Sequence, residues 1–513
     1  MVAQAWSLRS FDRWRPRVTV PADTLPLPPF LHRGANRLLI GGHFVEPLAG
    51  QSYEVINPAS GEPLVPAGRG GAEDIDRAVA AARAAFEGTW RATGPRDRQR
   101  ILVRLADLVV ENADELALLE SLEMGMPLKH ARAGVVYSAQ FLEWYAACAR
   151  MITGETIENS RPAQMFSYTL KEPVGVVGAI TPWNGPVLSA AWKIGPVLAT
   201  GCTVVHKPAS QSPFSALRFA ELCLEAGAPE GVVNVVPGGA DAGGALAAHL
   251  GVDKVAFTGS VSTGQQIVRA SAGNVKRLSL ELGGKSPNIV LADADLDRAA
   301  RGAAMGIFAG NGQVCVAPSR LFVQRSIYEE FTAKVAALGR ALVVGDPLDP
   351  KTDLGPVATR SQLDRVLEYV EAGKADGARL ITGGQRLQEG ALANGYYVQP
   401  TVFVDVHDEM RIAREEIFGP VLSALPFDDL DEVVRRANAT TYGLAAYVWT
   451  NSVSSAHQLA SRIQAGIVSI NSVGNLDAAV PVGGYKLSGY GRELGTHQLD
   501  DYLNVKSVWI RKA

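Results

Sequence analysis

Residues 174–210 read VGVVGAITPWNGPVLSAAWKIGPVLATGCTVVHKPAS. A β-rich run at Val174–Ile180 comes first, a helix-length apolar segment starts near Val187, and a second β-rich run follows at Thr203–His206. Two strands joined through a helix are typical of a parallel β-α-β unit. Both strands are apolar almost throughout, as expected of strands covered on both faces. The stretch therefore predicts an α/β fold.

This alternation of strands and helices continues in two blocks. The first block extends to about residue 283, and the second begins near Ser286 after a glycine-rich turn. Before both blocks, apolar residues at helical spacing predict a helical opening section. We therefore expect two α/β domains. The further strands expected are Val232–Val236, Lys254–Phe257 and Arg277–Leu282 in the first block, and Leu321–Gln324, Thr401–Val404, Val421–Phe427, Ala446–Thr450 and Ile467–Ile470 in the second.

Two further segments, Met165–Lys171 and Asp501–Ile510, alternate apolar and polar residues as half-buried strands do. We expect them to pair outside the two main domains. An isolated edge there would leave backbone groups unpaired, so the chain is predicted to associate as a homodimer or homotetramer. The first ~35 residues hold five prolines and no continuous apolar region, which predicts a loosely ordered leader rather than a secretory signal.

Composition limits the classes of function. The 513 residues carry 49 basic and 52 acidic side chains, so the net charge of −3 provides no field that would attract nucleic acid or an anionic membrane. The most apolar stretch, 187–205, is interrupted by Lys193, glycines and a proline, and is not expected to span a bilayer. Four scattered cysteines do not make a disulfide framework. We expect a cytoplasmic protein with a small-molecule substrate.

Several generic motifs are absent. Gly284-Lys285-Ser286 lacks the earlier glycine of a P-loop, because Ser279 stands there. There is no G-x-S-x-G elbow, and no G-x-G-x-x-G fingerprint follows any predicted strand. The eight histidines show no metal-ligand spacing, so no metal is expected. A dinucleotide, if bound, must be held in another way.

The loops that follow the predicted strands carry the recognisable signal, because ligands bind at these ends of open parallel sheets. From about Leu38 to the C-terminus, these loops resemble the aldehyde dehydrogenase superfamily in order. Any one of the motifs would be a weak match, whereas seven in order are specific. They are Thr181-Pro182-Trp183-Asn184, Lys207-Pro208-Ala209-Ser210, Phe257-Thr258-Gly259-Ser260, Leu280-Glu281-Leu282-Gly283-Gly284-Lys285, Gly312-Gln313-Val314-Cys315, Glu415-Glu416-Ile417-Phe418-Gly419-Pro420 and Gly489-Tyr490-Gly491-Arg492-Glu493-Leu494-Gly495.

The resemblance implies an aldehyde dehydrogenase-like α/β fold with a Rossmann-like cofactor domain, an α/β catalytic domain and a small β oligomerisation element. Mapped onto the predicted strands, the resemblance implies a flexible leader over 1–36, a dinucleotide-binding domain over 37–153 and 174–283, a catalytic domain over 284–484, and the oligomerisation element over 154–173 and 485–513.

The resemblance also implies the catalytic groups of a hydrolytic, NAD(P)-dependent enzyme. Cys315 is the implied nucleophile that forms a thioester, and a nearby positive field is expected to favour its thiolate. Asn184 and the backbone N–H of Cys315 are the implied oxyanion hole. Glu281, among apolar neighbours, is the implied general base for thioester hydrolysis. Glu493 is implicated in passing the proton onward, and Lys193 is assigned to the same machinery.

Each residue taken alone has a plainer interpretation. A cysteine is more often an apolar filler, Asn184 is a suitable turn residue, Glu281 could be a solvated strand end, and Glu493 could be a structural carboxylate paired with Arg492. An acylating, coenzyme A-dependent relative and a catalytically silent binding protein are the rival functions. Glu281 argues against the first rival, since acylating relatives usually lack a glutamate there. The presence of Cys315, Asn184 and Glu281 together argues against the second.

Cofactor contacts carry over in the same way. Gly259 and Ser260 open a helix whose N-terminus suits pyrophosphate, and Lys207 would reach the adenosine ribose. Ser210 stands where many NAD-selective relatives have a glutamate that repels a 2′-phosphate, so NADP is expected to be accepted as well as NAD. Glu416 would bind the nicotinamide ribose. The other expected contacts are Thr181, Pro182, Trp183 and Phe418.

Departures from the family pattern concern the aldehyde tunnel. Relatives that favour small aldehydes often place aromatic rings at four positions that are not aromatic here. A wider, aliphatic tunnel and a bulky apolar aldehyde are therefore expected, unless other loops refill the space. The four positions are Gly185, Ala309, Leu476 and Val482, and Trp192 and Phe308 are the aromatic residues expected nearby.

Overall fold

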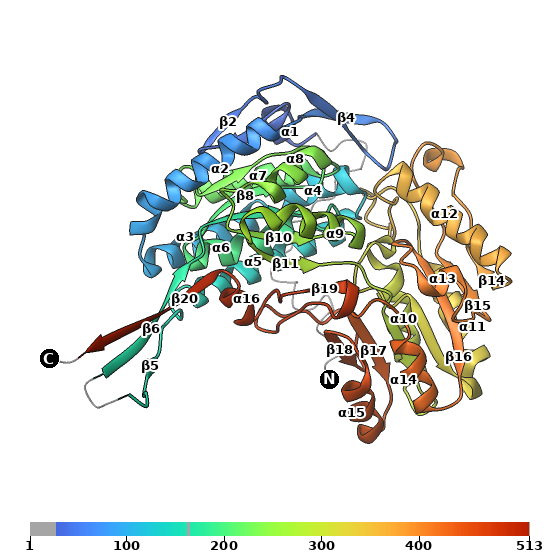
Figure 1. Cartoon of the computed structure of the whole chain (residues 1–513). Helices are drawn as coiled ribbons and strands as arrows, with labels where there is room; N and C mark the ends of the chain where they lie inside the picture. The colour runs from blue at the N-terminus through green and yellow to red at the C-terminus, as the bar shows by residue number, and fades with distance from the viewer. Residues whose placement is uncertain (1–26, 162–164, 512–513) are drawn as a thin grey trace.

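The computed structural model describes residues 27–161 and 165–511. Two large sheets, each covered by helices, form two neighbouring bodies, and a narrow β arm projects from the first (Figure 1). The mixed α/β fold predicted from the sequence is confirmed. None of the helices in these two ranges is both long and apolar enough to cross a bilayer.

The first sheet has five parallel strands at its centre. Their order, β11-β10-β7-β8-β9, places the strand that opens the 174–210 stretch in the middle. Every residue of β7 and β8 is buried, which explains why these strands are apolar throughout. Antiparallel strands extend the sheet at both edges. Its strands are β1 (Leu38–Ile40), β2 (His43–Val45), β7 (Val176–Ile180), β8 (Thr203–Lys207), β9 (Val233–Val235), β10 (Lys254–Thr258), β11 (Arg277–Glu281) and β19 (Gly489–Tyr490).

Helices cover both faces of this sheet (Figure 1). The one that follows β7 is apolar on nearly all sides and packs beneath two helices of the opening section, α3 and α5. Buried Glu120 and Glu123 accept hydrogen bonds from backbone N–H groups at the starts of α6 and α7. The helices are α2 (Ala72–Glu87), α3 (Pro95–Glu111), α4 (Ala113–Met124), α5 (Leu128–Cys148), α6 (Pro186–Thr200), α7 (Pro213–Glu225), α8 (Ala240–Ala248), α9 (Val261–Ala270) and α16 (His497–Asp500).

The second sheet has the strand order β14-β15-β16-β13-β12-β17-β18, and all its neighbours are parallel except β14 and β15. The interior strand β12, which lies between β13 and β17, begins with Pro287, a position where a missing N–H does little harm. The strands are β12 (Pro287–Val290), β13 (Arg320–Gln324), β14 (Arg379–Thr382), β15 (Thr401–Val404), β16 (Val421–Phe427), β17 (Ala445–Trp449) and β18 (Ile467–Ile470), and the helices are α10 (Leu296–Phe308), α11 (Tyr328–Ala341), α12 (Arg360–Ala375), α13 (Arg411–Arg414), α14 (Leu430–Asn438) and α15 (Val453–Arg462).

The arm is a three-stranded antiparallel sheet of β5 (Thr156–Ile157), β6 (Met165–Pro173) and β20 (Leu503–Arg511). It carries exposed apolar side chains, with Val505 63% and Trp509 53% exposed. The expected pairing of 165–171 with 501–510 is present in the ladder between β6 and β20.

The assignment of all of 485–513 to this element was wrong, because β19 pairs with β11 in the first sheet. A separate hairpin, β3 (Ser52–Ile56) and β4 (Pro63–Gly68), lies near the chain start.

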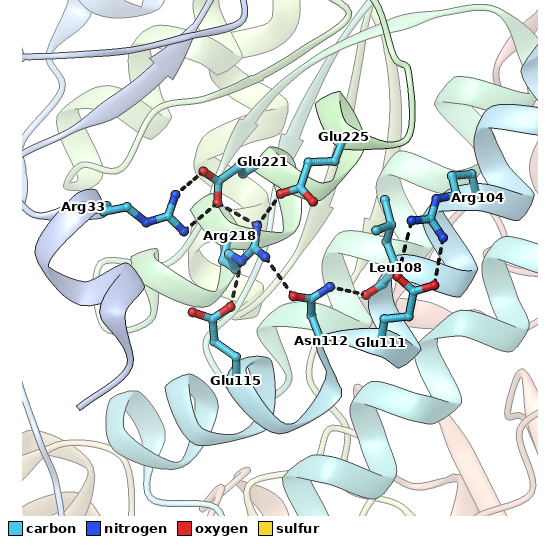
Figure 2. Close-up of polar contacts among 9 residues, drawn as sticks. All are labelled: Arg33, Arg104, Leu108, Glu111, Asn112, Glu115, Arg218, Glu221 and Glu225. Carbon is cyan, nitrogen blue, oxygen red and sulfur yellow. Dashed lines mark hydrogen bonds and ion pairs between the residues drawn. The ribbon is translucent and has the colours of Figure 1, made fainter. Parts of the chain in front are cut away.

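Part of the expected leader is ordered. Residues 1–26 lie outside the described residues, but α1 (Pro29–Gly34) packs on α7 with Phe30 and Leu31 fully buried. Figure 2 shows the polar network beneath it, in which nearly buried Arg218 on α7 binds carboxylates from α4 and α7. Arg33 joins the network through Glu221 at 2.7 Å. The folded domain therefore begins before residue 37.

Candidate active site

A tightly turned loop presents Cys315 between the two sheets. It follows α10 and contains three successive left-handed residues, Gly310, Asn311 and Gly312. A side chain at 312 would approach the carbonyl oxygen of Gly419 to 2.1 Å, so only glycine allows the loop to pack there. Asn311 donates to the carbonyl oxygen of Pro356, which anchors the turn. The loop conformation is therefore fixed by its own sequence.

The Cys315 thiol is partly exposed, unlike the other three cysteines, which are buried. The surrounding protein desolvates a thiolate there, and Glu416 and Glu281 add negative charge, so the pKa of Cys315 rises to about 12. Hydrogen bonds from the backbone N–H groups of Val316 and Cys315 act in the opposite direction. The charged side chains that act on the thiol are carboxylates, so they do not supply the expected positive field.

Asn184 lies against the cysteine loop from the first domain. It follows β7 at the N-terminal side of α6, and its amide donates to the carbonyl oxygen of Gln313 at 2.8 Å. Gln313 is itself held by the backbone N–H of Ala358 at 2.9 Å. An amide NH₂ group has two donors, so one remains for a ligand beside Cys315.

Glu281 is the last residue of β11, and the surrounding protein shields it from solvent. Its side chain is buried, and Oε1 has no hydrogen-bond partner within the described residues. Burial and the nearby Glu493 hold the pKa of Glu281 well above its usual range, while Lys193 and Arg492 lower it. A carboxyl whose pKa is raised in this way is a stronger base than a solvated glutamate, as a general base should be.

Lys193 and Glu493 form a buried ion pair beside Glu281, and each side chain is 1% exposed. Lys193 comes from α6, and Glu493 from the segment after β19, where its backbone pairs with Val482 at 2.8 Å. Arg492, the expected structural partner of Glu493, donates instead to the carbonyl oxygens of Gly484 and Gly491. The plainer interpretation of Glu493 as an Arg492-paired carboxylate is therefore wrong.

The carboxyl ends of β7 and β8 bring the first cofactor candidates together. Thr181 donates its N–H to the carbonyl oxygen of Lys207 at 3.2 Å, and its hydroxyl contacts His206 at 2.8 Å. Burial lowers the pKa of Lys207 to about 8, and Asp241 opposes this shift. Lys207 therefore stays mostly protonated at neutral pH. Ser210 lies in the following turn, partly exposed.

Ser260 caps the ten-residue helix α9, accepting from the N–H of Thr263 at 3.2 Å. Gly259 precedes it and donates to the carbonyl oxygen of Glu281 at 3.0 Å. This helix start lies at the same sheet edge as Lys207, since β10 and β8 both flank β7. A helix N-terminus and a lysine at one edge suit a pyrophosphate-containing ligand.

Glu416 reaches this edge from the second domain. Its carboxylate accepts from the N–H of Gly284 at 3.0 Å, and a Cβ at position 283 would lie 2.1 Å from it. Burial raises the pKa of Glu416 to about 7. Next to it, the ring of Phe418 meets that of Trp183 edge to face at 5.5 Å between centroids. Pro182, partly buried, completes the strand-end turn.

The residues expected to line the aldehyde tunnel lie in different parts of the structure. Trp192, Leu476 and Val482 pack in or against the core of the first domain, and Ala309 begins the cysteine loop. A Cβ at Gly185 would have one neighbour within 4 Å, the Cβ of Leu188 at 3.8 Å. Space is therefore open at this position.

Phe308 was wrongly expected near the tunnel, since it is fully buried in the second domain against Gly339 of α11. Two aromatic residues on α5 were missed. Tyr137 meets Phe141 edge to face at 5.0 Å, and Phe141 meets Trp192 at 5.5 Å. Tyr137 also donates its hydroxyl to the carbonyl oxygen of Leu476. Trp192 therefore packs against an aromatic side chain on α5.

Between residues 27 and 511, apart from the gap at 162–164, no cluster of three or more histidine, cysteine, aspartate or glutamate side chains could hold a metal ion. The acid, thiol and amide groups instead converge where the two domains meet. This arrangement provides a nucleophile, a desolvated base and an amide donor at one place. A carbonyl compound is the class of substrate that needs all three.

The comparisons with known proteins agree with this chemistry. The family model described as "Aldehyde dehydrogenase family" matches residues 44–508. The chain belongs to the aldehyde dehydrogenase family. An aldehyde dehydrogenase of Enchytraeus buchholzi is 47% identical over 481 residues, which cover 93% of this chain and 96% of that protein.

Solved aldehyde dehydrogenases share the whole fold. The NAD⁺ complex of the Bacillus cereus enzyme is 46% identical, with a TM-score of 0.92 over 95% of this chain and 99% of that one. A betaine aldehyde dehydrogenase from Staphylococcus aureus, a point mutant in complex with NAD⁺, is 38% identical, with a TM-score of 0.91 over 93% and 97% of the two chains. The predicted aldehyde dehydrogenase-like fold is therefore confirmed.

Proposed function

We propose that this aldehyde dehydrogenase uses NAD to oxidise an aldehyde to its carboxylic acid through a thioester on Cys315, with Glu281 as the hydrolytic base. The observation that carries the proposal is the convergence described above. Cys315 stands on a rigid loop, the Asn184 amide binds that loop at 2.8 Å, and Glu281 is a desolvated carboxyl that acts on the thiol electrostatically.

The side chains at the sheet edge fit a dinucleotide. The start of α9 and Lys207 offer donors for phosphate and ribose oxygens, and Glu416 offers two acceptor oxygens for ribose hydroxyls. Trp183, Phe418, Thr181 and Pro182 would line the same site. When bound, NAD⁺ would supply the hydride acceptor and a positively charged nicotinamide ring.

The reaction divides into two halves. In the first, the Cys315 thiol loses its proton to water, its sulfur bonds to the aldehyde carbon, and the aldehyde oxygen becomes an alkoxide stabilised by the Asn184 amide and the Cys315 N–H. Loss of hydride from that carbon leaves a thioester. In the second, Glu281 removes a proton from water as its oxygen bonds to the thioester carbon, and the carbon–sulfur bond breaks. Glu493 and Lys193 would carry the proton onward.

We further infer a domain division that follows the two sheets. The dinucleotide-binding domain comprises the first sheet with its helices, including β19, and the catalytic domain comprises the second sheet. The arm formed by β5, β6 and β20 would mediate homodimer or homotetramer formation, because its exposed Phe166, Val505 and Trp509 offer an apolar surface for a second copy.

A bulky apolar aldehyde is the substrate class that we propose. Position 185 is open, so a short aldehyde would leave space unfilled, although nearby Trp192 packs against the aromatic ring of Phe141. Each buried methylene adds ~0.8 kcal/mol, so kcat/KM should rise by at least roughly tenfold from acetaldehyde to a ten-carbon branched, cyclic or aromatic aldehyde.

The test is NADH formation across that series, with and without coenzyme A. Gly185→Phe, which fills the open space, should reverse the preference, and Gly185→Ala should keep it. A series that peaks at two or three carbons would contradict the wide tunnel. Turnover that requires coenzyme A would instead identify an acylating enzyme, and no turnover with any aldehyde would indicate a silent homologue.

Acceptance of NADP is a separate expectation. Ser210 carries no charge to repel a 2′-phosphate, and Lys207 lies at the end of the neighbouring strand β8 as a cation. We expect kcat/KM for NADP to lie within a thousandfold of that for NAD. Ser210→Glu should lower the NADP value alone, by on the order of 100-fold, because like charges are brought together. Ser210→Ala is the matched control, and equal losses for both cofactors in Ser210→Glu would refute this explanation.

A further inference from the structure

The Gly284-Lys285-Ser286 triplet, which lacks the earlier glycine of a P-loop, places a lysine deep in the second domain. Lys285 is 1% exposed and lies two residues before β12. Its ammonium nitrogen, Nζ, has no hydrogen-bond partner within the described residues. An ammonium group has three donors, and burying such a cation without a partner is costly. A ligand that carries negative charge would remove this cost.

Lys285 lines a small cavity at the edge of the second sheet where its strands begin. Ser286 and Pro287 form one wall, and Arg320, the first residue of β13, forms another. The segments that lead into β17 and β18, two strands that lie side by side (Figure 1), line the other sides. The space admits roughly one water-sized atom or ion. The Ser286 hydroxyl, also buried and without a partner in the described ranges, offers a further donor.

The charged side chains that line this cavity are positive. Arg320 is buried and donates to three backbone carbonyl oxygens, one of them that of Lys285. A guanidinium group has five donors, so two remain. Lys486 donates to two more carbonyl oxygens, at the end of α14 and just after it. These oxygens are therefore used by other cations, and no aspartate or glutamate of the described chain lines the cavity.

The carboxylates that act on Lys285 do not hydrogen-bond to it within the described residues. Burial is the largest influence and lowers the pKa of Lys285 to about 7. Arg320 and Arg365 lower this pKa further, whereas Glu416 and Glu415 raise it. The ammonium is therefore present below about pH 7, and a bound anion would stabilise it and raise the pKa.

We propose that this cavity binds one small inorganic anion of the size of chloride, held by the Lys285 ammonium with Arg320 beside it. A monatomic anion fits the space, whereas phosphate or a carboxylic acid would need room for several more atoms. A water molecule would fill the same volume but would leave the positive charge unbalanced. The proposal does not depend on the reaction described above, because these residues take no part in it.

Bromide is the probe for this site, because it can replace chloride and scatters X-rays anomalously. Crystals of the full chain grown with sodium bromide should give an anomalous peak within contact distance of Lys285 Nζ.

In solution, sodium chloride should raise the midpoint of thermal unfolding by about 1 °C or more over sodium gluconate at equal ionic strength. The physical reason is that a ligand which binds only the folded state stabilises it. The difference between the two salts should fade as pH rises above about 7, because Lys285 then loses its proton.

Lys285→Met keeps much of the volume and removes the charge, so it should abolish the difference between chloride and gluconate. Lys276→Met is the matched control. Lys276 is also buried, but its ammonium donates to the carbonyl oxygens of Ala247 and His249. This variant should keep the chloride effect. A chloride effect of wild-type size in Lys285→Met would place the anion elsewhere and overturn the proposal.

The bromide measurement uses the unaltered chain, so it remains a test even if Lys285→Met does not fold. Electron density beside Lys285 without an anomalous signal would identify a water molecule, and the absence of density would show that no ligand is held there. Either result would overturn the proposal. A bromide peak in crystals of a protein that shows no chloride effect in solution would mean binding at crystal concentration only, which also contradicts it.

Discussion

Cys315→Ala should abolish aldehyde oxidation, with kcat falling by on the order of 10⁴-fold or more, because no other group in the site can form the thioester. Binding of NAD should be nearly unchanged, since the strand-end residues Thr181, Lys207 and Ser260 belong to the first domain and the cysteine loop follows α10 of the second. Stopped-flow NADH formation and NAD titration by fluorescence measure the two effects.

The matched control is Cys148→Ala, which removes a thiol buried in α5 on the core side of the first domain. That variant should keep full chemistry even if its stability falls. Appreciable turnover in a folded Cys315→Ala protein would eliminate covalent catalysis by this residue.

Glu281→Gln should produce one rapid turnover followed by a steady state lower by about 10³-fold. Glutamine has nearly the same shape but cannot accept a proton, so thioester formation survives and its hydrolysis loses the base. In the wild-type enzyme, the raised pKa of Glu281 means that the carboxylate is present only above that pKa, and steady-state turnover should therefore rise as pH increases through it. The slow phase in Glu281→Gln should lose this pH dependence.

Glu120→Gln provides the comparison for Glu281→Gln. Glu120 is another buried glutamate, with its pKa raised to about 7, and it accepts from the N–H of Val187 at the start of α6. Its replacement should affect stability without producing a burst followed by a slow phase. Equal reduction of burst and steady state in Glu281→Gln would place this residue before hydride loss.

Much of the sheet architecture follows from local sequence. The strands Thr401–Val404, Val421–Phe427 and Ile467–Ile470 have the predicted bounds, because each is a run of mostly apolar or β-branched residues bounded by turns. The interior strand β12 was missed, since four residues that begin with a proline carry too weak a local signal. Long-range pairing, as of β19 with β11, leaves almost no signal in the sequence near it.

In the candidate site, too, some residues could be predicted from the sequence and others could not. Its motifs were located through their ordered resemblance to the aldehyde dehydrogenase superfamily, and the structure places Asn184 against the Cys315 loop and Glu281 where it acts on the thiol electrostatically. Phe308 could have been assigned correctly, because Ala300, Ala304 and Phe308 repeat every four residues on the buried face of α10. Tyr137 reaches Leu476 from a distant segment, and spacing along the chain does not indicate this.

The most direct test is the intact mass of Glu281→Gln after mixing with NAD and a stoichiometric amount of a bulky aldehyde. The account predicts a protein heavier by one acyl group, with the addition mapped by peptide mass to Cys315 and lost slowly as the free acid appears. Rapid NADH formation with no mass addition at Cys315, or an addition on another residue, would contradict the thioester mechanism.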